Sequence, residues 1–234
     1  MPAGLIFSYM FIFAHLFCGL LLGLGFYHLT HDRRAIPLCI VSSLIPDIID
    51  KPLGLLFPAL GSGRTIFHSL LVVLIVAIIG LVILRNRYLL LSIAAACCIF
   101  VHQVLDAMWQ LPAIWTYPLS GPFPLYSPPD YLGHSLWLEI TTPSEWIFLM
   151  ATVVMMLRIF STRHDVPEGG HSFRVVTIML LAGLGIFMAG AGIFGAYNTF
   201  LAPAYSQVTT CMSGILALAG AAVMSQWHRS DPRL

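Results

Sequence analysis

Charged residues are scarce in this chain: only 9% of its 234 residues are Asp, Glu, Lys or Arg, whereas 59% are hydrophobic. A soluble domain carries about 25% charged residues, because polar groups must cover much of its surface. The composition therefore excludes an ordinary water-soluble fold. The net charge of +1 leaves no basic patch to neutralise phosphates, so we expect no nucleic-acid partner.

Cysteine pairs with metal-binding spacing are absent as well. No CxxC pair occurs among the five cysteines, which all lie in apolar stretches: Cys18, Cys39, Cys97, Cys98 and Cys211. We interpret them as small buried hydrophobic side chains and expect neither disulfides nor zinc ligation by sulfur. The N-terminus also lacks a basic segment followed by a cleavage site. The first apolar segment is therefore expected to be a retained span and not a signal peptide.

What the chain has in place of charge is long apolar runs. A helix needs about 20 apolar residues to cross the hydrocarbon core of a bilayer. Seven segments are expected to cross, of which the second is the shortest: 5–27, 35–50, 66–84, 88–110, 144–160, 174–197 and 205–226. The sequence thus predicts an all-α, polytopic transmembrane helix bundle in a single membrane domain, 1–234. Whether residues 35–50 cross fully is left open.

The remaining long segment, 111–143, is rich in proline and aromatic residues and is predicted to be an irregular interfacial loop. The spans beyond it, in 144–234, carry many glycines and alanines and almost no ionisable groups, which is typical of helices that pack closely in lipid. We therefore interpret 144–234 as scaffold and expect any chemistry in 1–110.

The basic residues predict an orientation. If all seven segments cross, nine of the eleven Lys and Arg residues fall on one side: Arg33, Arg34, Arg85, Arg87, Arg158, Arg163, Arg174, Arg229 and Arg233. Only Lys51 and Arg64 fall on the other side. The positive-inside rule then predicts an inner or plasma membrane protein with its N-terminus outside and its C-terminus in the cytoplasm.

Ionisable residues inside the first four predicted spans need a reason, since each costs about 2.5–3.5 kcal/mol at the centre of a spanning helix. Six of them are expected toward the outer half of the membrane: His15, Asp47, Asp50, His68, His102 and Asp106. His102 and Asp106 are four residues apart and so share one helical face. A lone buried histidine is more often structural, but three histidines and three carboxylates together form a ligand set for zinc, or for manganese or iron. We therefore predict a site for one or two divalent ions. The role of His134, in the outer loop, is left open.

Four motifs in this order resemble the membrane-bound metal-dependent hydrolase family of bacteria and archaea: HLFCG at 15–19, LIPDIID at 44–50, GRTIFHSLL at 63–71 and HQVLD at 102–106. The resemblance covers about residues 10–125. It implies that the six His and Asp residues are the metal ligands and that Arg64 is the cation facing the substrate. The sequence departs from the family pattern at Thr65, at Phe67 and after Asp106. The order of ligands is also similar, more weakly, to that of zinc-dependent phospholipase C enzymes.

These observations favour an enzyme: a phosphoesterase that acts on a lipid or lipid-linked, phosphorylated substrate at the outer leaflet. Arg64 would then bind a phosphate oxygen, and Asp50 would be the general base if it is not a ligand. The main competing hypothesis is a transporter or channel for a divalent cation or protons. Haem ligation by His15 and His102 is a third hypothesis, and a purely structural or partner-binding role is a fourth. The substrate, the metal and the oligomeric state are left open.

Overall fold

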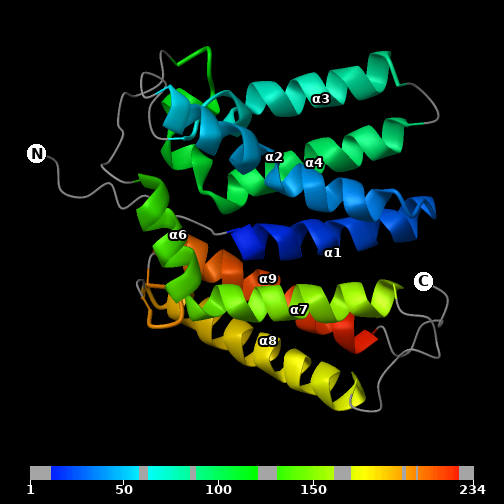
Figure 1. The fold of residues 1–234 in the computed structure, drawn as a ribbon, viewed down its shortest axis with the longest axis vertical. Helices are drawn as coiled ribbons and strands as arrows, with labels where there is room; N and C mark the ends of the chain where they lie inside the picture. Colours follow the sequence, from blue (N-terminus) through cyan, green and yellow to red (C-terminus); the bar gives the residue numbers. More distant parts are fainter. Residues whose placement is uncertain are drawn as a thin grey trace, which may run out of the picture. The chain divides into compact units, whose positions relative to one another are not determined.

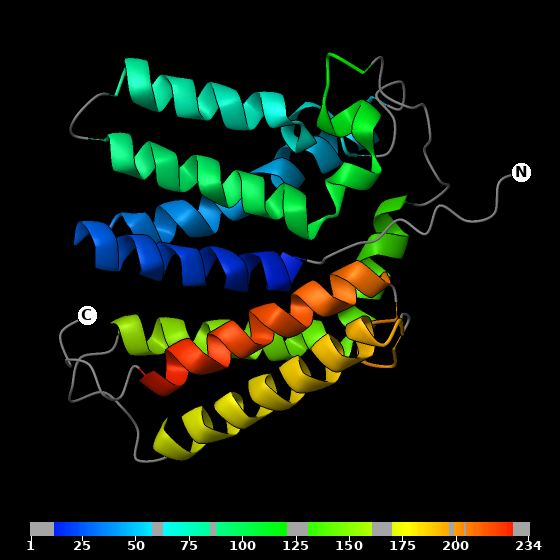
Figure 2. The same ribbon diagram turned by 180° about the vertical axis from the view of Figure 1, so that it is seen from behind.

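The computed structural model describes residues 12–57, 63–84, 88–120, 131–160, 170–196, 199–203 and 205–226, without the side chains of 131–132, 134–135 and 170–171. Figures 1 and 2 show this part of the chain from opposite sides. Within it the regular structure is helical, and the only extended pairing is the isolated bridge between Thr199 and Ala202. The predicted all-α class is confirmed for these residues.

A helix lies in every segment that was predicted to cross the membrane. The seven longest are α1 (Ile12–Thr30), α2 (Ala35–Leu56), α3 (Leu70–Val82), α4 (Leu89–Leu105), α7 (Pro143–Phe160), α8 (Gly170–Ile193) and α9 (Gln207–Gln226). The short elements are the 3₁₀ turns η2 (Ile66–His68) and η3 (Met108–Gln110), and the helices α5 (Pro112–Trp115) and α6 (Tyr131–Thr141).

Four of these helices, α1, α7, α8 and α9, are long and apolar enough to cross a bilayer. Helices α3 and α4 are apolar but shorter. Helix α2 has the length, but it contains Pro46 and Pro52 and three charged residues. The structure therefore establishes a helical membrane protein with at least four candidate spans, and the predicted total of seven crossings stays a prediction.

The prediction of an irregular segment over 111–143 is wrong for its second half. Residues Tyr131–Thr141 form α6, and Pro143 starts α7 directly after it. The helix forms because no proline occurs between Tyr131 and Thr142, and Pro143 is tolerated in the first turn of the next helix. The prolines that motivated the prediction lie mostly in 121–130, outside the described residues.

The chain divides into two compact units, and the division falls inside α1, between Phe17 and Cys18. Unit 2 comprises Cys18–Glu139 and contains the last three of the four motifs, at 44–50, 63–71 and 102–106. In it, α4 packs against both α2 and α3, and the small residues Cys39, Ala94 and Cys98 form a fully buried core between the helices.

Two local features fix the turn between α1 and α2. A Cβ atom on Gly23 would lie 2.8 Å from Ile36 Cα, so only glycine allows this close approach. The second feature is the Asp32 carboxylate in the loop, which accepts hydrogen bonds from the Arg34 guanidinium and from the Arg34 backbone N–H. These bonds also hold the pKa of Asp32 below its usual range.

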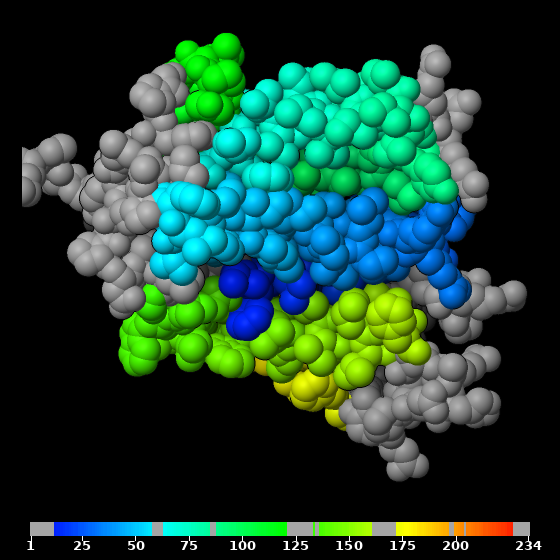
Figure 3. Space-filling view, turned by 45° about the horizontal axis from the view of Figure 1, so that its top comes forward, coloured from blue at the N-terminus to red at the C-terminus, as the bar shows by residue number. Residues whose placement is uncertain are grey.

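Helix α3 presents an aliphatic face at the surface of unit 2. Figure 3 shows α3 at this surface, and its exposed side chains are all aliphatic: Leu74, Ile75, Ile78, Ile79, Leu81 and Val82. Aliphatic side chains exposed along a helix are expected where the helix faces lipid.

Unit 1 comprises residues 1–17 and 140–234, and its main contact is between α8 and α9. Small residues allow this contact: Gly192 lies against Cys211, and Gly214 lies against the backbone of Ala189. Glu145, in the first turn of α7, is fully buried and accepts hydrogen bonds from the backbone N–H groups of Phe13 and Ala14. Its other oxygen accepts one from the Tyr205 hydroxyl at 2.6 Å. This carboxylate thereby satisfies donors in the first described turn of α1.

Candidate metal centre

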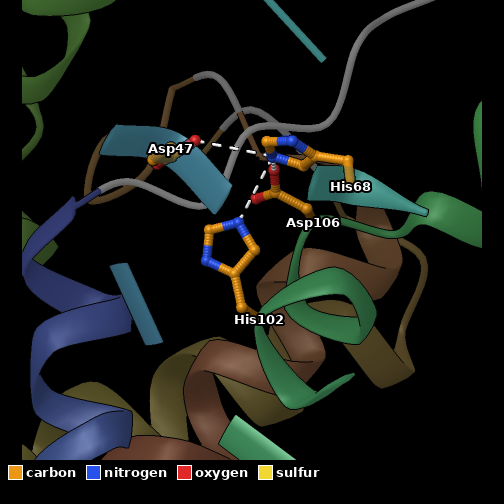
Figure 4. A group of neighbouring side chains, drawn as sticks. All are labelled: Asp47, His68, His102 and Asp106. Atoms are coloured by element: carbon orange, nitrogen blue, oxygen red, sulfur yellow. Dashed lines mark hydrogen bonds and ion pairs between the residues drawn. The ribbon is translucent and has the colours of Figure 1, made fainter. Parts of the chain in front are cut away.

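Four ionisable side chains of unit 2 converge on one point (Figure 4). Asp47 comes from α2, His68 from η2, His102 from α4, and Asp106 from the residue that follows α4. Each offers one ligand atom, and the four atoms lie within 4.8 Å of one another. All four residues are buried, with at most 6% of their surface exposed. Segments far apart in the sequence thus meet at this site.

The end of α4 places two of the four side chains together. His102 and Asp106 are one helical turn apart, and the Asp106 N–H donates to the His102 carbonyl at 3.0 Å. The helix stops there because Ala107 adopts a left-handed conformation, with φ of +52°. The chain turns away at Ala107, and both side chains stay on the face that points to α2 and η2.

Hydrogen bonds fix the orientation of both imidazole rings. His102 Nδ1 lies 2.8 Å from the Ser43 carbonyl, which can only accept, so this nitrogen carries the proton. His68 Nδ1 lies 2.8 Å from Asp50 Oδ2 and donates to that carboxylate. In the neutral rings, both Nε2 atoms therefore present lone pairs to the site. Metal-binding histidines typically donate their second nitrogen to a carboxylate or a carbonyl in this way.

The two Nε2 atoms lie 3.3 Å apart. His68 Nε2 is also 3.5 Å from Asp47 Oδ1 and 3.7 Å from Asp106 Oδ2. In a tetrahedral zinc site with bonds of about 2.0–2.1 Å, neighbouring ligand atoms are about 3.3–3.4 Å apart. Two facing lone pairs and two carboxylate oxygens attract a cation, so this group could hold a metal ion.

Two cations flank the carboxylates of the group. Lys51 Nζ lies 2.7 Å from Asp47 Oδ2, and Arg64 Nη2 lies 3.1 Å from Asp106 Oδ2. Each buried carboxylate thus has a charged partner, which offsets part of the cost of removing it from water. Lys51 donates to the Asp47 oxygen that does not face His68, so Oδ1 is left directed at the histidines.

Asp50 lies behind His68 and not in the group of four. Its Oδ2 accepts from Thr65 N at 2.7 Å and from His68 N at 3.1 Å, in addition to the ring. Its Oδ1 accepts from the Thr65 hydroxyl at 2.6 Å and from Phe67 N at 3.3 Å. Asp50 therefore holds the turn that carries His68. The carboxylate bonds to these N–H groups hold residues 65–68 in a 3₁₀ turn, so α3 begins at Leu70 and not at the predicted residue 66.

A glutamine for which the sequence predicted no role also shapes the site. The Gln103 side chain donates to the Ser69 carbonyl at 2.9 Å and to the Phe67 carbonyl at 3.3 Å, and it accepts from the Trp115 indole N–H at 3.0 Å. It therefore connects α4, the His68 turn and α5. The sequence does contain a signal for Gln103, because it is a polar residue within an apolar segment and directly follows His102. The Ser43 carbonyl had no sequence signal, because every residue carries a carbonyl.

The structure brings together four of the six predicted ligands and places Asp50 next to them. His15 lies in the part of α1 that belongs to unit 1 and is fully buried there, so its participation in metal binding stays a prediction. Arg64 lies beside the group, on Asp106. The side chain of His134 is outside the described part of the chain.

An all-helical protein with at least four helices apolar and long enough to cross a bilayer, and with ionisable side chains buried among its helices, is a membrane protein. This chain belongs to the YdjM inner membrane protein family, whose family model matches residues 10–193. No curated protein and no solved structure matches the chain. The family description names a membrane location and no reaction. The resemblance to metal-dependent hydrolases and the predicted orientation of the termini therefore stay predictions.

Proposed function

We propose that this protein is a membrane-embedded, metal-dependent hydrolase that cleaves a phosphoester of a lipid or lipid-linked substrate. One observation carries the proposal: two histidine Nε2 atoms and two carboxylate oxygens converge in a buried site while both Nδ1 atoms are held by acceptors. An arrangement of two nitrogens and two oxygens is a common ligand set for zinc, with manganese or iron as the alternatives.

In this proposal Asp47, His68, His102 and Asp106 hold the ion. A divalent ion in such a site lowers the pKa of bound water and polarises phosphoryl oxygens. Asp50 orients His68 through Nδ1, which is a positioning role and differs from the ligand or base that the sequence predicted. Four ligand atoms are enough to hold one ion. A second ion, with His15 among its ligands, stays a prediction.

Arg64 supports the phosphoester assignment. Its guanidinium is buried beside the ligand carboxylate Asp106, with 5% of the residue exposed. A guanidinium carries N–H donors in a planar fork that matches phosphate geometry. A substrate phosphate that reaches the ion would therefore meet a cation next to it.

The membrane setting supports a lipid substrate. The site lies among helices whose outer surface is aliphatic, and a substrate with an apolar chain partitions into that environment. The Trp115 side chain, hydrogen-bonded to Gln103 next to His102, places an aromatic segment at the edge of the site.

Metal analysis of purified wild-type protein beside His102→Ala tests the proposal. We expect about one zinc, manganese or iron ion per wild-type chain, and at least a tenfold loss in the variant, because one of four ligands is gone. Hydrolysis of a lipid phosphate monoester in mixed micelles should fall with the metal content. The matched control is His28→Ala, which removes an exposed histidine near the end of α1. It should change neither the metal content nor the rate of hydrolysis.

Two outcomes would contradict the proposal. Turnover that persists in metal-free protein would remove the role of the ion. Metal-dependent cation flux into proteoliposomes, without hydrolysis of any lipid phosphoester, would support a transporter.

A further inference from the structure

Arg174, in the first turns of α8, is buried without a hydrogen-bond partner for two of its nitrogens. Only 8% of the residue is exposed, and Nε and Nη1 are both enclosed and unpaired. Within the described part of the chain, no carboxylate forms an ion pair with it. Burying a guanidinium whose N–H groups have no acceptor costs free energy. A bound anion would offset that cost.

A second arginine adds positive charge beside Arg174 and so increases the free-energy gain from a bound anion. Arg158 lies near the end of α7, close enough to Arg174 for the two charges to repel each other. The end of α7 and the start of α8 lie at the same end of unit 1 in both ribbon views (Figures 1 and 2). Arg158 is exposed, whereas Arg174 is buried, so the pair extends from the surface inward. Two like charges that repel each other are stabilised by an anion that contacts both.

The start of α8 adds donors at the same place. Helix α8 begins at Gly170, only four residues before Arg174, and is 24 residues long. The first backbone N–H groups of a helix have no partner within the helix, and the helix dipole makes this end positive. Phosphate groups bind at such ends.

The position of this cluster relative to the membrane identifies the anion. Helices α7 and α8 are both candidate spans, over Pro143–Phe160 and Ser172–Ile193. The cluster is therefore at the end of two spans, where phospholipid head groups lie, and the predicted orientation puts it at the cytoplasmic leaflet. We propose that Arg158, Arg174 and the N-terminus of α8 bind the phosphate of an anionic phospholipid. The site belongs to unit 1, whereas the candidate metal centre belongs to unit 2.

The thermal unfolding of purified protein in a neutral detergent tests this proposal with three additives. Phosphatidylglycerol should raise the Tm of the wild-type protein, whereas phosphatidylcholine, which has no net charge, and millimolar inorganic phosphate should not. For Arg174→Gln we expect about a tenfold or greater loss of apparent affinity for phosphatidylglycerol, because charge-assisted bonds to the phosphate disappear. Native mass spectrometry should show the lipid retained by the wild-type protein and lost from the variant.

Matched variants keep the result interpretable. Arg33→Gln removes an exposed arginine from the α1–α2 loop and should leave the lipid response unchanged. Arg158→Gln alters an exposed residue and is expected to fold, so it tests the site even if Arg174→Gln does not fold; it should also weaken lipid binding.

Three outcomes would overturn the proposal. The first is an equal phosphatidylglycerol response in the wild-type protein and both cluster variants. The second is equal protection by inorganic phosphate, which would assign the site to a free anion. The third is an Arg174→Gln protein that is destabilised to the same extent with and without lipid, because that result would indicate an anionic partner within the protein.

Discussion

Asp50 is the residue whose surroundings define its role most fully. Both of its oxygens accept hydrogen bonds from the turn that carries His68, and one of them also accepts from the ring. An asparagine has one acceptor oxygen and one NH₂ donor group, so it cannot satisfy Thr65 and His68 together. We therefore expect Asp50→Asn to lower the affinity for metal by about 10–100-fold, which is typical for the loss of a group that orients a ligand.

Competition with a fluorescent chelator measures this affinity directly. Asp32→Asn is the control, because this carboxylate pairs with exposed Arg34 in a loop and should leave the affinity unchanged. If Asp50→Asn lost all metal at every concentration, while keeping its Tm, Asp50 would be a ligand, as the sequence predicted.

At this scale the sequence predicted the residues that gather in the buried group better than it predicted what holds them in place. Asp47, His68 and His102 stood out because ionisable residues are costly in apolar helices. Their spacing could not separate Asp47 from Asp50, which are the same residue type three positions apart. Which of the two faces the histidines depends on the turn at 65–68, and bonds to Asp50 are among those that hold this turn.

The glycines of α8 and α9 show how packing separates residues of one type. The sequence predicted a scaffold with many small residues, and the structure divides them into two groups. A Cβ atom on Gly214 would lie 2.8 Å from Ala189 Cα, whereas one on Gly183 would meet nothing within 4 Å. The composition predicts that the helices approach closely. Which glycines cannot be replaced depends on where α8 and α9 touch, and that position is seen only in the structure.

The same substitution at these two glycines should therefore have opposite effects. Gly214→Ala must push α8 and α9 apart and should destabilise the protein by about 1–3 kcal/mol, as overpacking does. Gly183→Ala fills open space and should stabilise α8 by about 0.5–1 kcal/mol, since alanine is the better helix former. Thermal unfolding in one detergent compares the two, and a lower Tm for Gly183→Ala would contradict this account.

Over the whole molecule, the number of crossings decides near which side of the membrane the group of Asp47, His68, His102 and Asp106 lies. Helix α2 contains prolines and charges, and α3 has only 13 residues. The sequence predicted these helices from their apolar runs. How many of α2, α3 and α4 span the bilayer depends on how lipid accommodates a short helix and the charges of α2, which an apolar run does not encode.

Accessibility labelling tests whether an odd number of these helices crosses the membrane. In a chain whose native cysteines are replaced by alanine, we expect Leu119→Cys to react with a membrane-impermeant maleimide in intact cells, and Arg33→Cys only after permeabilisation. Three crossings, by α2, α3 and α4, separate the two positions, and both residues are exposed. If both positions react from the same side, an even number of crossings separates them, so at least one of the three helices does not cross, and the positive-inside orientation fails with it.

The bond between Trp115 and Gln103 has a practical consequence. Indole emission depends on the hydrogen bonding and polarity around its N–H, and here that N–H is tied to the neighbour of His102. In a chain whose other tryptophans are replaced by phenylalanine, intrinsic fluorescence would report in real time, without any attached dye, whether an added metal ion changes the surroundings of Trp115.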